Sequence, residues 1–170
     1  MRFDKLTLKA QEAVQAAQEM AAQRDHQKIE PLHFLAALLQ QQEGIVPPLL
    51  ARLGVPQQIL SADLEKKLAQ LPAVTGMAQQ YLGPAANEVL KRSFDEAQQF
   101  RDEYVSTEHL LLAIAALPRD PAADLLRRNG AGRDAILQAL ASLRGTQRVT
   151  SPNPEATYRA LEQYTRDLTD

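Results

Sequence analysis

The chain has 170 residues, of which 45% are hydrophobic and 24% charged, and its formal net charge is -2. A chain of this length forms one compact domain that buries about 70% of the surface its unfolded form exposes. The lack of cysteine excludes disulfides and thiolate zinc sites, and the balanced charge argues against a basic face for nucleic acid. Because no apolar run is long enough for a membrane span and no signal-peptide core follows Met1, we expect a cytoplasmic protein without membrane or nucleic-acid partners.

The first half of the chain predicts four helices. Apolar residues recur at helical spacing between Leu6 and Ala21, and Thr7 is well placed to cap that helix. Each of the other three helices opens with a proline, which favours the first turn of a helix. These prolines are Pro31, Pro47 and Pro56. Gly54 ends the short third helix and Pro72 ends the fourth, so a linker is expected to follow.

The second half repeats this plan. Pro84 opens a helix directly after Gly83, Ser106 is suited to cap the next helix, Pro121 opens a short one, and Gly145 closes the last. No stretch shows strand alternation between hairpin turns. The expected fold class is therefore all-α, with eight helices followed by a C-terminal linker helix.

The two halves align without a gap at an offset of 76 positions. The block Leu6–Leu71 matches Leu82–Gln147, and IEPLHFLAALLQ at Ile29–Gln40 returns as VSTEHLLLAIAA at Val105–Ala116. A period this long that occurs only twice indicates a duplicated half-domain rather than a solenoid. We therefore expect one domain over residues 3–146, built from two four-helix repeats, 6–71 and 82–145, related by approximate two-fold symmetry.

The tail of the chain has a different character. Residues Gly145–Asn153 are polar and predict a flexible connection spanning roughly 15 Å. Pro154 then opens another helix, whose apolar stripe has no partner left in the chain. The stripe consists of Tyr158, Leu161, Tyr164 and Leu168. A short helix with an unpartnered apolar face is marginal on its own, so residues 147–170 are interpreted as a linker and the start of a following domain.

The sequence contains no motif for phosphate binding, dinucleotide binding, serine hydrolysis or zinc-dependent proteolysis. His33 and His109 occupy equivalent places near helix starts, and we interpret each as a polar residue that ties a helix turn to its neighbour. The alternative is a zinc or hydrolytic site that includes Glu108, while His26 is interpreted as a surface loop residue. A binding module without cofactor or metal is therefore expected rather than an enzyme.

The doubled repeat resembles a known family. The opening MRFDKLTLKAQEAVQAAQ, together with IEPLHFLAALL and STEHLLLAI, resembles the N-terminal domain of Clp-type AAA+ ATPases, and most closely that of ClpB-type disaggregases. The tail ALEQYTRDLTD is similar to the segment that enters their first nucleotide-binding domain. The resemblance implies a mobile substrate-binding domain on a homohexameric machine that uses ATP and Mg elsewhere in its chain. That machine handles unfolded or aggregated polypeptides together with the DnaK chaperone system.

The resemblance also implies site residues. Positions tied to substrate handling in the family match Thr7, Asp102 and Glu108, and an apolar groove position matches Leu90. Each has a structural alternative: Thr7 as a helix cap, Asp102 as a solvated loop charge, Glu108 as a favourable charge at a helix start, and Leu90 as a core residue.

We expect these residues to border a shallow apolar groove between the repeats, with an acidic rim, that binds unfolded chains weakly. The alternative function is an adaptor-docking domain that recognises a folded partner, as in protease-associated Clp ATPases.

Overall fold

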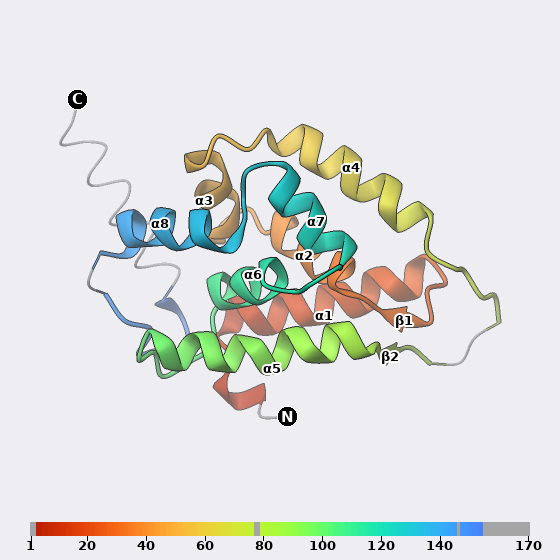
Figure 1. Ribbon diagram of the computed structural model, residues 1–170. Coiled ribbons are helices and arrows are strands. Elements are labelled where there is room, and N and C mark those ends of the chain that lie inside the picture. The colour runs from red at the N-terminus through yellow and green to blue at the C-terminus, as the bar shows by residue number, and fades with distance from the viewer. Residues whose placement is uncertain (1–2, 77–78, 146, 155–170) are drawn as a thin grey trace.

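The computed structural model describes residues 3–76, 79–145 and 147–154. Within these ranges it contains eight α-helices, which confirms the all-α prediction (Figure 1). The helices are α1 (Leu8–Gln23), α2 (Pro31–Gln40), α3 (Val46–Arg52), α4 (Gln57–Ala69), α5 (Pro84–Gln99), α6 (Thr107–Ala115), α7 (Pro121–Arg128) and α8 (Arg133–Arg144). A short 3-10 turn covers Phe3–Lys5, and two strands are β1 (Lys28–Ile29) and β2 (Tyr81–Leu82). None of the described helices is long and apolar enough to cross a membrane. The helix expected after Pro154 lies outside the described residues.

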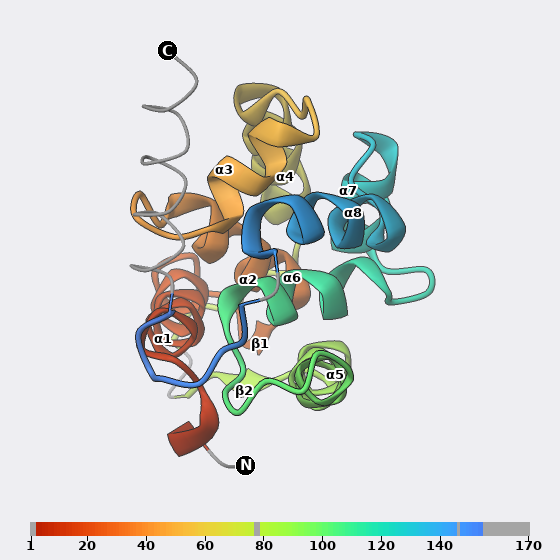
Figure 2. The ribbon, with the colours of Figure 1, turned by 90° about the vertical axis from the view of Figure 1, so that its left-hand side faces the viewer.

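The helices form three layers, with α2 and α6 in the middle (Figures 1 and 2). Helices α1 and α5 lie on one side of this pair, and α3, α4, α7 and α8 lie on the other. Every residue of α6 is buried, and so is every residue of α2 except Gln40. Helices that are buried on all sides lie in the centre of a domain, so this pair forms the core on which the other elements pack.

Two short parallel pairings join the repeats. Ile29 of β1 pairs with Leu82 of β2, and an isolated parallel bridge joins Leu6 to Val105. At the offset of 76 positions Leu6 corresponds to Leu82 and Ile29 to Val105, so exchanging the repeats turns one pairing into the other. This reciprocal exchange is the arrangement that an approximate two-fold axis between the repeats produces.

The buried helices α2 and α6 begin with matching histidine caps. The backbone N–H of Glu30 donates to Nδ1 of His33 at 2.8 Å, and the backbone N–H of Ser106 donates to Nδ1 of His109 at 2.8 Å. In both capping boxes the histidine is the third helical residue and is fully buried. The structure thus shows both histidines tying a helix turn, as interpreted from the sequence.

The prediction that His26 is a surface loop residue is wrong. Its side chain is buried, and its Nδ1 lies 2.9 Å from Nε2 of His33. Because Nδ1 of His33 accepts from the backbone, Nε2 carries the proton and donates to His26. The equivalent position in the second repeat is Asp102, which accepts a hydrogen bond of 2.7 Å from Nε2 of His109. Both repeats therefore place an acceptor behind the capping histidine.

The central layer should carry much of the stability. We expect Leu111→Ala to lower the free energy of unfolding by about 2–5 kcal/mol, because it leaves a cavity in a fully buried part of α6. Urea denaturation followed by circular dichroism measures this. The control Ile59→Ala removes an apolar side chain that is 55% exposed, and should change stability by no more than about 0.5 kcal/mol. Equal effects of the two variants would contradict this account of the core.

The histidine pair should make stability depend on pH. Burial, followed by the neighbouring His26 and Arg24, lowers the pKa of His33 from 6.5 to about 4. The unfolded chain therefore binds a proton on this residue at a higher pH than the folded chain does. It follows that the free energy of unfolding falls as the pH drops from about 6.5 to about 4.

His33→Gln tests this, because glutamine at the same position still caps the helix but does not titrate. Urea denaturation at several pH values should show a smaller loss of stability over this window for His33→Gln than for the unaltered chain. An identical pH profile for the two proteins would rule out His33 as the titrating group.

Candidate functional site

A buried polar cluster lies at the start of α6. Asp102 accepts hydrogen bonds from His109 at 2.7 Å and from Nη2 of Arg144 at 2.7 Å, and Nη1 of Arg144 lies 3.4 Å from Oε2 of Glu108. The side chains of Asp102 and Glu108 are fully buried, and that of Arg144 is 4% exposed. Ser106 also donates its hydroxyl hydrogen to Glu108. The structure thus brings together two of the three polar positions that the resemblance singled out.

The cluster keeps Asp102 ionised. Burial by itself would raise the pKa of Asp102, but the hydrogen bonds from His109, Arg144 and the backbone N–H of Val149 outweigh it and lower the pKa to about 2. The interpretation of Asp102 as a solvated loop charge is therefore wrong, since its carboxylate is satisfied entirely inside the protein. Arg144 was not among the site residues predicted from the sequence. It stands where the first repeat has Leu68, so comparing the repeats would have marked it as a charged residue at an apolar position.

Thr7 and Leu90 have structural roles, the first as a helix cap and the second as a core residue. The Thr7 side chain accepts a hydrogen bond from the backbone N–H of Ala10 and caps α1, while its own N–H donates to the carbonyl of Val105 beside α6. Leu90 is fully buried in the core. Neither side chain reaches solvent, and the same is true of Asp102 and Glu108. Direct contact of these four residues with a substrate stays a prediction.

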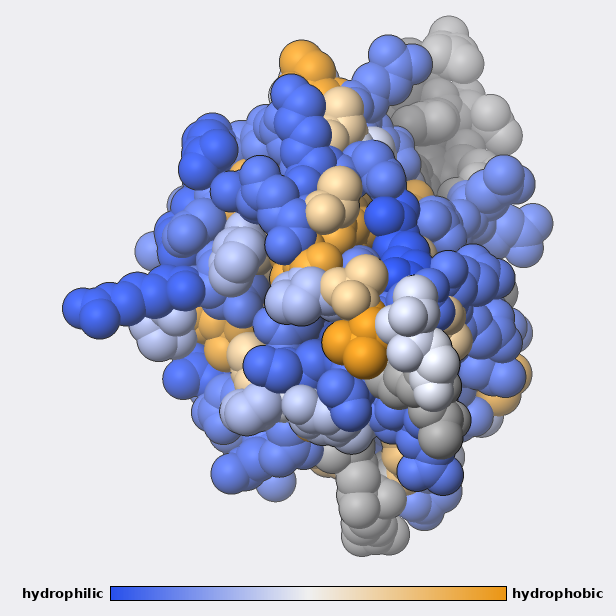
Figure 3. Space-filling view, turned by 90° about the vertical axis from the view of Figure 1, so that its right-hand side faces the viewer, coloured by the Kyte–Doolittle hydropathy of each residue, from blue (hydrophilic) through white to orange (hydrophobic). Residues whose placement is uncertain are grey.

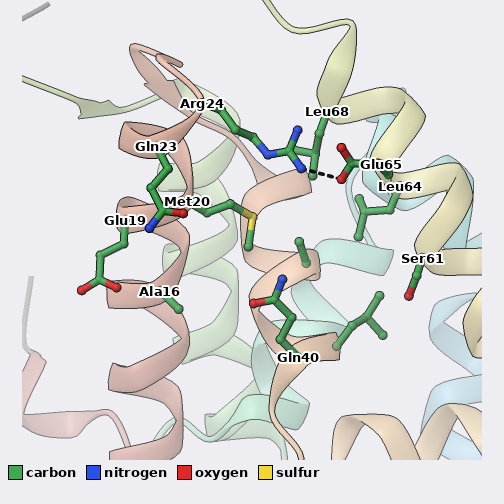
Figure 4. A pocket seen from close by; sticks show the side chains of 12 residues that line it. Ala16, Glu19, Met20, Gln23, Arg24, Gln40, Ser61, Leu64, Glu65 and Leu68 are labelled. Atoms are coloured by element: carbon green, nitrogen blue, oxygen red, sulfur yellow. Dashed lines mark hydrogen bonds and ion pairs between the residues drawn. The ribbon is translucent and has the colours of Figure 1, made fainter.

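A hollow of about 440 Å³ lies within the first repeat, between α1, α2 and α4 (Figure 4). Its lining is mainly apolar at the floor and polar at the rim. The floor residues are Ala16, Met20, Ala36, Leu39, Leu64 and Leu68, and the rim residues are Glu19, Gln23, Arg24, Gln40, Ser61 and Glu65. An ion pair between Arg24 and Glu65 joins α1 to α4 across the rim. The sequence placed a groove between the repeats, whereas this hollow lies inside one of them.

The matching place in the second repeat is charged. A hollow of about 550 Å³ between α5, α6 and α8 is lined by Glu88, Arg92, Asp95, Glu96, Gln99, Ala113, Ala116 and Arg133. Glu96 stands where the first repeat has Met20, and both of its carboxylate oxygens accept hydrogen bonds from Arg133, at 2.6 and 2.9 Å. An apolar ligand would have to displace this bidentate ion pair. The first repeat therefore offers the better apolar site.

Apolar surface is also visible at the end of the molecule where β1 and β2 lie. Figure 3 shows apolar residues gathered in the middle of this face, surrounded by polar side chains. Contiguous exposed apolar surface of this kind is typical of interaction sites. Among the residues that the structure describes, no group of three or more His, Cys, Asp or Glu side chains is placed to hold a metal ion, and His33 and His109 each serve as a helix cap.

Comparison with known proteins agrees with this architecture. The profile of the Clp repeat (R) N-terminal domain family matches residues 5–129. The chaperone protein ClpB of Rhodopirellula baltica is 40% identical over 168 residues, and that of Bacillus cereus is 38% identical over 172 residues. Each of these alignments covers 99% of this chain, which spans about a fifth of the length of those relatives.

The solved structures include similar folds. The crystal structure of the Hsp104 N-terminal domain from Candida albicans has a TM-score of 0.78 and 27% identity, covering 89% of this chain and 99% of that one. The N-terminal domain of the ClpV1 ATPase from Escherichia coli has a TM-score of 0.70 and 25% identity, covering 85% and 88%. The chain therefore belongs to the Clp repeat N-terminal domain family, and within it resembles the N-terminal domains of ClpB and Hsp104 chaperones.

Proposed function

We propose that this chain is the substrate-binding N-terminal domain of an ATP-dependent protein disaggregase, and that it passes unfolded or aggregated polypeptides to an ATPase ring. The observation that carries the proposal is the hollow between α1, α2 and α4, which has an apolar floor and a polar rim. The family membership supports it. In this proposal ATP, Mg, the hexamer and cooperation with DnaK belong to a longer cytoplasmic protein, and this chain has no catalytic activity or cofactor of its own.

The hollow suits apolar side chains that an unfolded polypeptide exposes. Its volume lies at the small end of the range for ligand pockets. Burying a leucine or phenylalanine side chain contributes about 1.5–3 kcal/mol, and ordering the unfolded polypeptide around it offsets part of this gain. Binding to a single domain is therefore weak. Several copies on one hexamer raise the effective concentration of sites, so weak individual binding still allows capture followed by release into the ring.

The adaptor-docking alternative requires recognition of a folded protein. The two functions differ in what they demand of the partner, because a hollow with an apolar floor binds only apolar side chains that are exposed. A protein that can be studied both folded and unfolded separates them. Reduced, carboxymethylated α-lactalbumin should bind the 170-residue chain, whereas the same protein with its disulfides intact should not. Failure of the unfolded form to bind would favour adaptor docking, and equal binding of both forms would contradict recognition of exposed apolar side chains.

Changing the floor of the hollow tests the site directly. We expect Met20→Glu to weaken binding of labelled, carboxymethylated α-lactalbumin by about tenfold or more, because it places in the first repeat the charge that the second repeat carries at Glu96. Fluorescence anisotropy measures this. Met20 is only partly buried, so the fold should tolerate the change.

The matched control is Ile59→Glu, which makes the same kind of substitution at an exposed position of α4 outside the lining of the hollow. It should leave the affinity unchanged. Equal loss in both variants would show that general surface hydrophobicity, rather than this hollow, binds the polypeptide. Nanomolar affinity of a single copy would also contradict the weak-binding mechanism.

A further inference from the structure

The segment Gln147–Pro152, called here the docked segment, packs on the domain instead of leaving it. In Figure 2 it leaves α8, in blue, and runs along the ends of α6 and α1. Val149 is fully buried, its N–H donates to Oδ1 of Asp102 at 2.8 Å, and its carbonyl accepts from the N–H of Glu103 at 2.7 Å. The prediction of a free, flexible connection is therefore wrong for these residues.

The docked segment is held at both of its ends. Nη2 of Arg144 donates to the carbonyl of Gln147 at 2.9 Å. At the other end the N–H of Leu8 donates to the carbonyl of Pro152 at 2.8 Å. Leu8 is the first residue of α1, where backbone N–H groups have no partner inside the helix. The docked segment thus provides an acceptor for one N-terminal N–H group of α1, and the side chain of Thr7 provides an acceptor for another.

Asp102 is the centre of this attachment. Its Oδ1 accepts from both Arg144 and Val149, and its Oδ2 accepts from His109. A buried carboxylate requires such donors, because removing it from water without them is strongly unfavourable. The docked segment therefore completes the coordination of a charge that is buried inside the domain.

The first repeat lacks this arrangement. At the offset of 76 positions, Asp102, Glu108 and Arg144 correspond to His26, Leu32 and Leu68, and Val149 corresponds to Ala73, which is exposed. The first repeat is followed by a connection to the second, whereas the second is followed by the docked segment. Of the two repeats, the second has the charged cluster, and it is also the second repeat that the docked segment follows.

We infer that Asp102, Arg144 and Glu108 form a binding site for the chain's own docked segment, and that this site fixes where the following polypeptide leaves the domain. Asp102 and Glu108 then affect substrate handling by positioning the domain rather than by touching substrate. The inference rests on the proposed function only in taking the following polypeptide to be the rest of a disaggregase. Release of the six-residue segment would lengthen the tether by at most about 20 Å.

The test is hydrogen exchange by NMR on the 170-residue chain carrying Val149→Asp. This change sets a second carboxylate against Asp102 and leaves all eight described helices untouched. The backbone amides of Leu8 and Glu103, neither of them altered, should exchange at least tenfold faster, because their acceptors lie in the docked segment. Thr150→Asp, at an exposed neighbouring position, should leave both amides as protected as in the unaltered chain. Unchanged exchange in Val149→Asp, or equal acceleration in Thr150→Asp, would overturn the inference.

A second variant approaches the site from the other side. Asp102→Asn keeps the shape of the side chain but removes its charge, and should accelerate exchange at Glu103 and Val149 while amides in the middle of α2 and α5 stay protected. If those helix amides lose protection to the same extent, the cluster serves the whole fold rather than the docked segment, and the inference fails.

Polypeptide binding separates this inference from the proposed function. Val149→Asp should bind carboxymethylated α-lactalbumin as the unaltered chain does, whereas Met20→Glu should lose binding and keep the amides of Leu8 and Glu103 protected. Loss of binding in Val149→Asp would show that the docked segment is itself part of the substrate surface, which overturns the inference. Unaffected binding in Met20→Glu would contradict the proposed function but not this inference.

Discussion

Two helices buried on all sides carry their unpaired N-terminal amide groups into the interior of this domain. Water cannot reach these groups, so the protein itself has to satisfy them. His33 and His109 do so through Nδ1, and each then presents a proton on Nε2 that needs a buried acceptor in turn. The first repeat supplies a second imidazole and the second repeat supplies a carboxylate. A carboxylate in the interior demands further donors, which explains why Arg144 and the backbone of Val149 gather around it.

The two repeats differ in charge, both behind the capping histidine and in the hollow between their helices. The first repeat places an imidazole, that of His26, behind its capping histidine, and leaves a hollow with an apolar floor between α1, α2 and α4. The second repeat carries charges in both places, at Asp102 near the cap and at Glu96 in the matching hollow. In the function and the inference proposed here, such divergence gives the first repeat a surface for polypeptides and the second a point of attachment, while α2 and α6 both stay buried at the centre.

Local patterns in the sequence predicted much of this fold. The spacing of apolar residues and the prolines at helix starts predicted the helices, because these features depend on near neighbours along the chain. The offset of 76 positions indicated their duplication. The burial of His26 and Arg144 depends on pairings between distant segments, which composition and spacing do not reveal. The same holds for Val149, a lone apolar residue in a polar stretch. The hollow in the first repeat was not predicted, because its walls come from three helices whose relative angles no local pattern determines.

The reciprocal pairings of Leu6 with Val105 and of Ile29 with Leu82 interlace the two halves of the chain. During synthesis on the ribosome, the residues around Leu6 emerge first but have no strand to pair with until Val105 has also left the exit tunnel. The first repeat therefore cannot form the pairing at its N-terminal end, and its apolar helix α2 lacks the contact with α6 until the second repeat has been synthesised. Contacts of such long sequence separation slow folding. The proposed substrate-binding domain is therefore itself an unfolded polypeptide during the early part of its synthesis.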